Sequence, residues 1–441
     1  MFVYSAAIMK PQSILLLAAL LGVATARAEN WAQWRGPNFN GSTVATSLPT
    51  TWSKTENVTW VTPLPGQSGA TPAIWGDSIF VSSPDAENNL LLLCLDRATG
   101  KVRWQKQLGT GNFSKGNNNL ATPSPATDGQ LVIALFGTGD LVALDFTGKV
   151  LWKRTLTVEY GKLAVNWLYG ASPLLHHGRL YVQLLQRNPP TYKHAIDDRP
   201  TRDSFLLCLD PQTGKYLWKQ PRTTEAPAEC MESYATPIPF KGKNGDEILL
   251  TGGDYVTAHD AATGAELWRC GGLNPTHQDW GRIVPSAVTC GDLVYASGPK
   301  SKMFLAIRDG GHGTVSATHV AWQFTNNAPD VCTSLVLDGE LYLLDGDRKV
   351  FLRLDPQTGA VKWQGPLPVD SVTRASPTSA DGKIYTISES GKCVVFAAGD
   401  EYKVLADNLL GEAPCRSSIA ISDGQLFIRT AKSLYCIGKP K

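Results

Sequence analysis

The chain has 441 residues, of which 43% are hydrophobic and 18% are charged. This composition is that of a folded globular protein, and it excludes a disordered or predominantly membrane-embedded chain. Because 41 Lys and Arg stand against 39 Asp and Glu, and no basic stripe runs along the sequence, we expect no binding to nucleic acid.

The N-terminal residues 1–28 predict a secretory signal. A lone Lys10 precedes an apolar run over 14–23, and Ala26 and Ala28 flank Arg27 in an A-x-A cleavage pattern. The apolar run is too short to span a bilayer, and no other run approaches that length, so we expect no transmembrane segment. Cleavage after Ala28 would leave 39 basic and 39 acidic residues in a soluble periplasmic or secreted protein.

A recurring phrase dominates the rest of the chain. It reads Asp, two variable residues, Thr-Gly, three variable residues and Trp, and its copies include Gly100, Gly148, Gly214, Gly264 and Gly359. The copy at Gly148 is one residue shorter. Where the phrase is clean it recurs every 49 or 50 residues, which is the period of a four-stranded β-propeller blade.

Each phrase predicts a turn between two strands. The Asp side chain can accept hydrogen bonds from nearby backbone N–H groups, and the Gly supplies a positive φ. The Trp falls on the following strand, where its ring can fill the space between neighbouring sheets. Upstream of each phrase, a Thr/Ser-Pro pair, a short apolar run and an Asp-Gly or Gly-Asp pair predict the first hairpin of the blade.

Counting these first turns gives eight blades, each with strands A to D. The turns lie at residues 76–77, 128–129, 177–178, 243–246, 291–292, 338–339, 381–382 and 423–424. The last blade lacks a D strand, and the segment 57–61 with Trp60 is predicted to complete it. Such closure removes exposed sheet edges. The predicted fold class is therefore all-β: residues 29–441 form one eight-bladed propeller of four-stranded antiparallel blades, closed by an N-terminal strand.

Nine cysteines are an odd number for an exported protein. Cys94, Cys208 and Cys436 occupy strand positions where small buried residues are expected. One disulfide is possible among five of the other cysteines, Cys230, Cys270, Cys290, Cys332 and Cys415, with a pairing that the sequence does not determine.

Propeller geometry restricts where a site can lie. The regular A–B and C–D turns share one face, here called the turn face, and the D–A and B–C connections share the other, here called the funnel face. The irregular residues, including the insertion 186–204, fall on the funnel face, and loops held by a rigid scaffold favour function. The candidate binding residues there are Trp167, Tyr169, Glu232, Tyr234, Arg282, Asp330, Arg374 and Arg416. The structural alternative is that these charges only pair with one another and keep the funnel solvated.

Other motifs of catalysis are missing from the sequence. Asp345, Gly346 and Asp347 resemble the start of a calcium loop, but no Glu follows at the required spacing, so a hairpin turn is expected. We find no Cys-x-x-Cys-His haem site, no phosphate-binding loop and no nucleophile elbow. We therefore name no catalytic residue and no metal ligand.

The repeats resemble the pyrroloquinoline-quinone-type (PQQ-like) propeller repeat over nearly the whole mature chain. In their details they look closer still to a group of exported PQQ-like repeat proteins of planctomycete-type bacteria. The resemblance rests on segments 31–37, 56–60, 252–254, 259–260, 344–349 and 397–405, the first of which contains Trp31, Trp34 and Arg35. More distantly, the chain resembles the propeller lipoprotein of the outer-membrane β-barrel assembly machinery (BamB-like), a scaffold without cofactor, although it lacks the lipid-anchor Cys.

This resemblance also implies a quinone cofactor as a possibility. Quinoprotein alcohol dehydrogenases of this fold use a disulfide of adjacent cysteines over the quinone and a Trp beneath it. They also use a calcium ion held by Glu and Asn, and a catalytic Asp. This chain has no adjacent Cys pair, and the calcium ligands find no matching positions.

Two functional hypotheses remain, with other enzymes such as hydrolases behind them. The first is an exported, non-catalytic, monomeric propeller that binds an envelope protein, a peptide or a small ligand at its funnel face, without a cofactor. The second is an oxidoreductase that uses PQQ with calcium. In it, Arg282, Arg374 and Arg416 would hold quinone carboxylates, Trp167 or Tyr169 would stack, and Glu232 or Asp330 would act as base or metal ligand.

Overall fold

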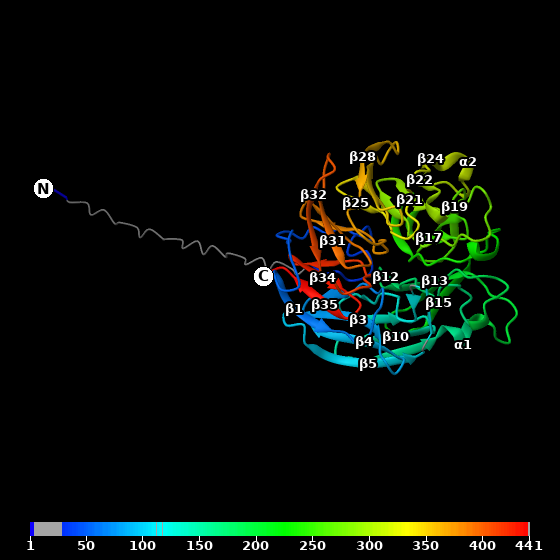
Figure 1. Ribbon diagram of the computed structural model, residues 1–441, viewed down its shortest axis with the longest axis horizontal. Helices are drawn as coiled ribbons and strands as arrows, with labels where there is room; N and C mark the ends of the chain where they lie inside the picture. The colour runs from blue at the N-terminus through cyan, green and yellow to red at the C-terminus, as the bar shows by residue number, and fades with distance from the viewer. Residues whose placement is uncertain (4–28, 112, 117, 440–441) are drawn as a thin grey trace.

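The computed structural model describes residues 1–3, 29–111, 113–116 and 118–439 (Figure 1). The predicted signal peptide falls almost entirely outside these residues. No helix in the described part of the chain is long and apolar enough to cross a membrane.

Eight antiparallel sheets follow one another around a ring, in the order of the colours of Figure 1. The first four blades, each from strand A to strand D, are β2 (Ala73–Trp75), β3 (Ser78–Pro84), β4 (Asn89–Asp96) and β5 (Val102–Thr110); β8 (Ala126–Thr127), β9 (Leu131–Leu135), β10 (Asp140–Asp145) and β11 (Val150–Thr155); β12 (Leu174–His176), β13 (Arg179–Leu184), β14 (Phe205–Leu209) and β15 (Tyr216–Pro221); and β16 (Ile238–Gly242), β17 (Gly245–Gly252), β18 (Tyr255–Asp260) and β19 (Glu266–Cys270).

The second four blades follow the same plan. They are β20 (Val288–Cys290), β21 (Leu293–Ser297), β22 (Phe304–Arg308) and β24 (Val320–Phe324); β25 (Leu335–Leu337), β26 (Glu340–Asp345), β27 (Val350–Leu354) and β28 (Val361–Pro366); β29 (Thr378–Ala380), β30 (Lys383–Ile387), β31 (Lys392–Ala397) and β32 (Val404–Leu409); and β33 (Ala420–Ser422), β34 (Gln425–Arg429), β35 (Ser433–Ile437) and β1 (Val58–Pro63). All eight predicted A–B turns are confirmed.

Short elements decorate this ring. They are the hairpin β6 (Ser114–Lys115) and β7 (Asn118–Asn119), the strand β23 (Gly313–Thr314), the helices α1 (Leu156–Tyr160) and α2 (Ser316–His319), and three 3₁₀ turns, Lys193–Ala195, Ala228–Met231 and Pro299–Ser301. The core lies between successive sheets, where the strands are buried and rich in Leu, Val and Ile.

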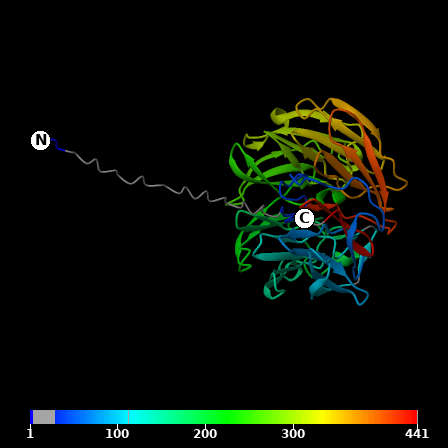
Figure 2. The ribbon, with the colours of Figure 1, turned by 90° about the vertical axis from the view of Figure 1, so that its left-hand side faces the viewer.

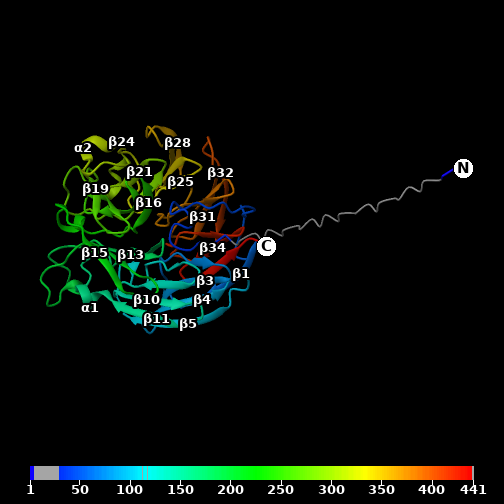
Figure 3. The same ribbon diagram turned by 180° about the vertical axis from the view of Figure 1, so that it is seen from behind.

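Ring closure follows the prediction. Strand β1 pairs antiparallel with β35, with Trp60 opposite Cys436, and so supplies the D strand that the last blade lacks. The N-terminal and C-terminal strands therefore lie side by side, as the blue and red ribbons show in Figures 2 and 3. Closure inside one sheet pairs the edge of β35 that would otherwise stay open, and it holds the two ends of the ring together.

The repeated Trp and Gly residues meet across blade boundaries. The indole of Trp152 donates to the backbone carbonyl of Pro211 in the C–D turn of the next blade, at 2.8 Å, and its ring covers Gly214 of that turn. Gly214 has φ +67°, and a Cβ there would lie 2.6 Å from the ring. The Gly of the phrase is therefore required twice, for its positive φ and for this close approach. Four other tryptophans, Trp60, Trp104, Trp322 and Trp363, donate to the next blade's turn in the same way.

Thr and Ser residues at the start of strand A, five of which precede a Pro, also join neighbouring blades. At the start of strand A, a backbone N–H donates to a hydroxyl of the next blade at 2.8–3.1 Å, seven times around the ring. The residues linked in series by these hydrogen bonds are Thr71, Ser124, Ser172, Thr236, Ser286, Thr333, Ser376 and Ser418. The Ser417 hydroxyl donates to the carbonyl of Ala70 and so links the last blade to the first. This hydroxyl ring surrounds the centre of the propeller.

The segment before β1 closes the centre of the ring. It enters from the turn face, where Asn30 accepts a bond from Gly76 of the first A–B turn. Gln33 then exchanges two 3.1 Å hydrogen bonds with the backbone of Leu175 in the third blade. The buried guanidinium of Arg35 donates to the carbonyl of Pro377 in the seventh blade at 2.7 Å. The segment therefore crosses the ring from the third blade to the seventh.

Candidate functional site

A cavity of about 360 Å³ occupies the centre of the funnel face. Its volume is in the range of small-molecule sites. Trp34, from the segment that crosses the propeller, lines this cavity. Six members of the hydroxyl ring also line it: Ser124, Ser172, Thr236, Thr333, Ser376 and Ser418. D–A connections of several blades supply the remaining side chains, so the site depends on the whole propeller.

Three arginines from D–A connections line one side of this cavity. Arg282 precedes the fifth blade, Arg374 the seventh and Arg416 the eighth. Each is anchored by a carboxylate: Arg282 by Asp330 at 3.4 Å, Arg374 by Asp347 at 2.7 Å and Arg416 by Glu389 at 2.9 Å. None of these three carboxylates lines the cavity. Among the described residues, the cavity therefore presents guanidinium groups and no acidic side chain.

Aromatic and amide groups line the opposite side. Trp167 precedes the third blade and Tyr234 the fourth, and Asn118 comes from the β7 strand. The Tyr234 hydroxyl accepts the backbone N–H of Trp167 at 2.8 Å, and the Asn118 amide donates to the Trp167 carbonyl at 2.9 Å. The Trp167 indole donates to Glu229 at 3.0 Å. Trp167 is thus fixed at the cavity wall while 37% of it stays exposed.

A buried carboxyl group supports this aromatic wall from behind. Glu232 is fully buried and accepts hydrogen bonds from the hydroxyls of Tyr192 and Tyr234 and from the backbone N–H of Asn166. Burial raises the pKa of Glu232 to about 7, and these hydrogen bonds oppose the rise. Glu232 therefore connects the insertion, through Tyr192, to the residues that position Trp167.

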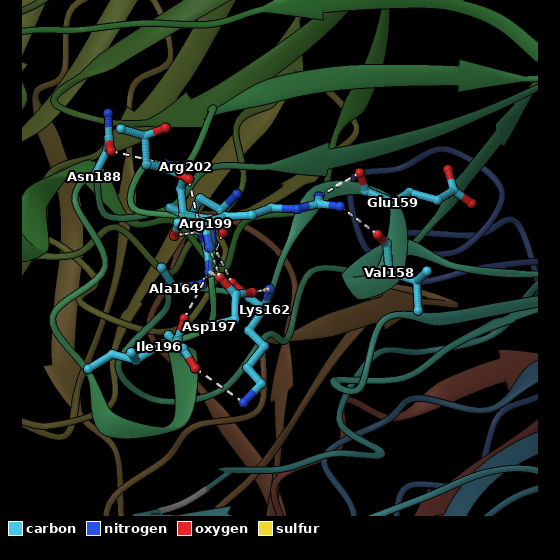
Figure 4. Close-up of polar contacts among 12 residues, drawn as sticks. Val158, Glu159, Lys162, Ala164, Asn188, Ile196, Asp197, Arg199 and Arg202 are labelled. Carbon is cyan, nitrogen blue, oxygen red and sulfur yellow. Dashed lines mark hydrogen bonds and ion pairs between the residues drawn. The ribbon is translucent and has the colours of Figure 1, made fainter.

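The insertion 186–204 is held in place by its own arginines (Figure 4). The buried Arg202 donates to the carbonyls of Lys162 and Ala195 and forms a 2.6 Å ion pair with Asp197. Arg199 donates to the carbonyls of Val158 and Glu159 at the end of the second blade. The insertion is therefore an ordered part of the funnel wall.

Of the eight residues predicted for the funnel face, five line this cavity: Trp167, Tyr234, Arg282, Arg374 and Arg416. The other three lie outside it. Tyr169 is buried, and its hydroxyl donates to the carbonyl of Gln183, so it does not offer its ring to a ligand in this cavity. Glu232 and Asp330 act as supports, Asp330 by accepting the backbone N–H of Lys300 and pairing with Arg282.

Sequence reasoning missed Trp34 and the hydroxyl ring. Trp34 belongs to a segment noted only for its resemblance to other proteins, and nothing local indicates that it crosses the ring. Five of the eight Ser and Thr hydroxyls precede a Pro in the sequence, and these repeated Thr/Ser-Pro pairs are the signal that could have located the cavity wall.

The lining residues do not fit a calcium–quinone centre. Trp34 and the arginines could face a flat anionic group, but no carboxylate lines the cavity, and calcium sites are built from several oxygen ligands that include carboxylates. No group of three or more His, Cys, Asp and Glu suited to a metal occurs within the described residues. Asp345 and Asp347 lie at a B–C hairpin, as predicted, and Asp347 is engaged with Arg374.

The disulfide considered from the sequence does not form. All nine cysteines are free thiols, and all but Cys290 are buried. Cys94, Cys208 and Cys436 lie in packed strands, as expected.

The sequence matches the family described as outer membrane protein assembly factor BamB over residues 43–181 and 202–438. A polyvinylalcohol dehydrogenase from a Pseudomonas species is 29% identical over 266 residues, covering 54% of this chain and 39% of that protein. BamB from Burkholderia pseudomallei is 22% identical over 237 residues, covering 53% and 52%. The matches thus span about half or less of these curated relatives.

Solved structures share the fold. BamB from Moraxella catarrhalis superimposes with a TM-score of 0.57 at 15% identity, over 86% of this chain and 99% of that one. A europium-containing methanol dehydrogenase gives 0.67 at 11% identity, over 92% and 90%. At these identities the likeness concerns the propeller alone. Because the family match covers most of the sequence, the chain belongs to the PQQ-like propeller family described as outer membrane protein assembly factor BamB.

Proposed function

We propose that this chain is an exported, non-catalytic propeller that binds an envelope partner in the cavity of its funnel face. The composition of the cavity supports this role. Its described lining contains arginines, aromatic rings and hydroxyls, but no carboxylate, imidazole or thiol. These groups are the commonest general acids, bases and nucleophiles. The one Tyr of the described lining, Tyr234, has its hydroxyl bonded to Glu232 and to the backbone N–H of Trp167.

The lining hydroxyls serve the fold. Ser124, Ser172, Thr236, Thr333, Ser376 and Ser418 each accept a backbone N–H from the preceding blade. None of these bonds involves a histidine that could activate a serine as a nucleophile. The cavity is therefore suited to recognition, and the family match to an assembly factor supports a scaffold role.

Site-directed photo-crosslinking in producing cells tests this role. A photoreactive residue placed at Val284, which lines the cavity, should give a discrete adduct, whereas one at Tyr216, exposed on the outer strand β15, should not. The adduct should disappear when Arg282, Arg374 and Arg416 are all replaced by Ala. An adduct that forms equally at both positions, or that survives the triple substitution, would show that the funnel is not the binding face.

A dehydrogenase is the second candidate. It is favoured by Trp34 and three arginines that line the same cavity and by the match to a polyvinylalcohol dehydrogenase. The test is reconstitution with PQQ and calcium, followed by reduction of an artificial electron acceptor with alcohols and sugars as substrates. Acceptor reduction that depends on substrate would establish this role, and its absence across the series would leave the binding role.

A further inference from the structure

A second cavity of about 280 Å³ lies on the funnel face between the second and third blades. Its walls are mainly apolar, with Leu120, Leu163, Val165 and Leu168 as the main side chains. Its other lining residues are Phe113, Gly137, Thr138, Thr157, Lys162, Tyr169 and His194. These residues come from the β9–β10 connection, from the D–A segments and from the insertion, all of which belong to the funnel face.

The two cavities share a wall. Along the segment from β6 to β7 and beyond, Gly116 and Asn118 line the arginine cavity, whereas Phe113 and Leu120 line the apolar one. Before the third blade the same division recurs, because Trp167 faces the arginine cavity while Leu168 faces the apolar cavity. Two thin stretches of chain therefore separate a cationic cavity from an apolar one.

The rim of the apolar cavity is accessible. Phe113 is 41% exposed, Lys162 is exposed and His194 is half-buried, and the Phe113 and His194 rings lie 5.3 Å apart. Below this rim, Leu163, Val165 and Leu168 are buried. An apolar side chain that entered here would leave water for a surface lined by hydrocarbon, which is favourable for a Leu or Phe.

From this arrangement we propose that the ligand of the funnel is a peptide segment that places an acidic group against the arginines and an apolar side chain in the second cavity. This inference rests on the proposed binding role and specifies its partner. Charge complementarity assigns the acidic group, because three guanidinium groups and no carboxylate line the cavity. The carboxylates that pair with these arginines, Asp330, Asp347 and Glu389, stand outside its lining. A chain of about seven residues, which extends to about 23 Å, gives an apolar residue and an acidic residue room to occupy both cavities.

Selection from a displayed library of random heptapeptides on the full-length mature protein tests the inference. The expected result is enrichment of Asp or Glu together with Leu, Phe or Trp at a constant spacing. Funnel-binding peptides that are acidic but have no apolar position would overturn the inference and leave the binding role intact. Absence of any funnel-dependent peptide would overturn the inference, and the crosslinking result at Val284 then decides separately whether the binding role stands.

Matched variants assign the two contacts in a titration with the synthetic consensus peptide. Arg374→Gln should weaken binding about tenfold or more, as expected for loss of a charge-assisted bond, whereas Arg103→Gln, which removes an ion-paired arginine on the outer strand β5, should not.

For the apolar cavity, Thr157→Met fills it and Val158→Met adds the same side chain at the neighbouring exposed position, which does not line the cavity. Thr157→Met should weaken the consensus peptide about tenfold and leave a peptide with Gly at the apolar position unaffected. Leu163→Trp provides a second filling variant, and unchanged melting temperatures confirm folding. Equal binding by both filling variants and wild type would overturn the assignment.

Discussion

The turn face and the funnel face of the propeller share one scaffold but serve different purposes. On the turn face, the Asp and Thr-Gly residues repeat with little change, and four of the five Trp residues of the phrase, Trp104, Trp152, Trp218 and Trp363, contact the next blade's turn. On the funnel face, the connections differ from blade to blade, and their arginines and aromatic rings surround a cavity. The comparison teaches that the repeated residues hold the blades together, whereas the unrepeated ones carry recognition.

The comparison is sharpest at the glycines of the turn face. Gly214→Ala should lower the free energy of unfolding by about 3 kcal/mol, because the new methyl group combines an unfavourable φ with a clash against the Trp152 ring. Gly382 has a similar φ of +65° but no heavy atom within 4 Å, so Gly382→Ala should lose only about 1 kcal/mol. Chemical denaturation of both variants checks this, and equal losses would mean that the inter-blade contact does not matter.

On the funnel face, the largest expected change in the free energy of unfolding comes from the protonation of Glu232 and therefore depends on pH. The pKa of Glu232 rises from its ordinary value of 4.5 to about 7 in the folded protein, so the folded state binds this proton more tightly than the unfolded state. Stability from this group is therefore present below about pH 4.5 and is lost as the pH rises to 7, by about 3 kcal/mol in total.

Glu232→Gln should remove this contribution to the slope. Glu247 provides the control, since it is also buried, at the junction of the fourth and fifth blades, with a pKa of about 7 raised by burial and by Asp309. Chemical denaturation between pH 4.5 and 7.5 gives the free energy of unfolding as a function of pH. Its slope against pH should be shallower in Glu232→Gln, and also in Glu247→Gln, than in wild type. An unchanged slope in Glu232→Gln would contradict the account of the carboxyl behind the aromatic wall.

Two tryptophans of the turn face allow a finer comparison. The Trp152 indole donates to the carbonyl of Pro211, whereas the buried Trp218 indole N–H has no protein acceptor. Trp152→Phe should therefore destabilise the protein by about 1 kcal/mol more than Trp218→Phe. Equal melting temperatures for the two variants would show that ring packing alone, without the hydrogen bond, joins the blades.

The smallest effect on stability should follow removal of a cavity arginine. Arg374→Gln breaks a partly exposed ion pair with Asp347 and should change the free energy of unfolding by less than about 1 kcal/mol. Thermal unfolding checks this. A loss several times larger would mean that the funnel arginines stabilise the fold by pairing with neighbouring carboxylates. The funnel face would then not differ from the turn face in the way proposed here.

Much of the architecture could be predicted because it is encoded in local, repeated signals. Asp-Gly and Thr-Gly turns located all eight blades, and the unmatched strand at Trp60 identified the closing segment. The site was harder to predict because it depends on chain crossings. Arg282, Arg374 and Arg416 were found from their place before strand A, but Trp34 reaches the cavity only because Gln33 and Arg35 bind opposite sides of the ring.

Burial could not be read from the sequence either. Tyr169 and Glu232 precede strand A like the residues that line the cavity, yet one enters the core and the other lies behind the aromatic wall. Which way a side chain points in an irregular connection depends on the neighbouring blade, and the repeat pattern gives no information there.

The most direct test of the central claim is a calorimetric titration of the mature protein with PQQ, with and without calcium. If the funnel is a binding surface without a quinone centre, calcium should leave the heat of mixing unchanged, and no micromolar calcium-dependent binding should be seen. Micromolar or tighter binding that requires calcium, and that is lost in an Arg282→Ala and Arg374→Ala double variant, would contradict the account and place a quinone in the funnel.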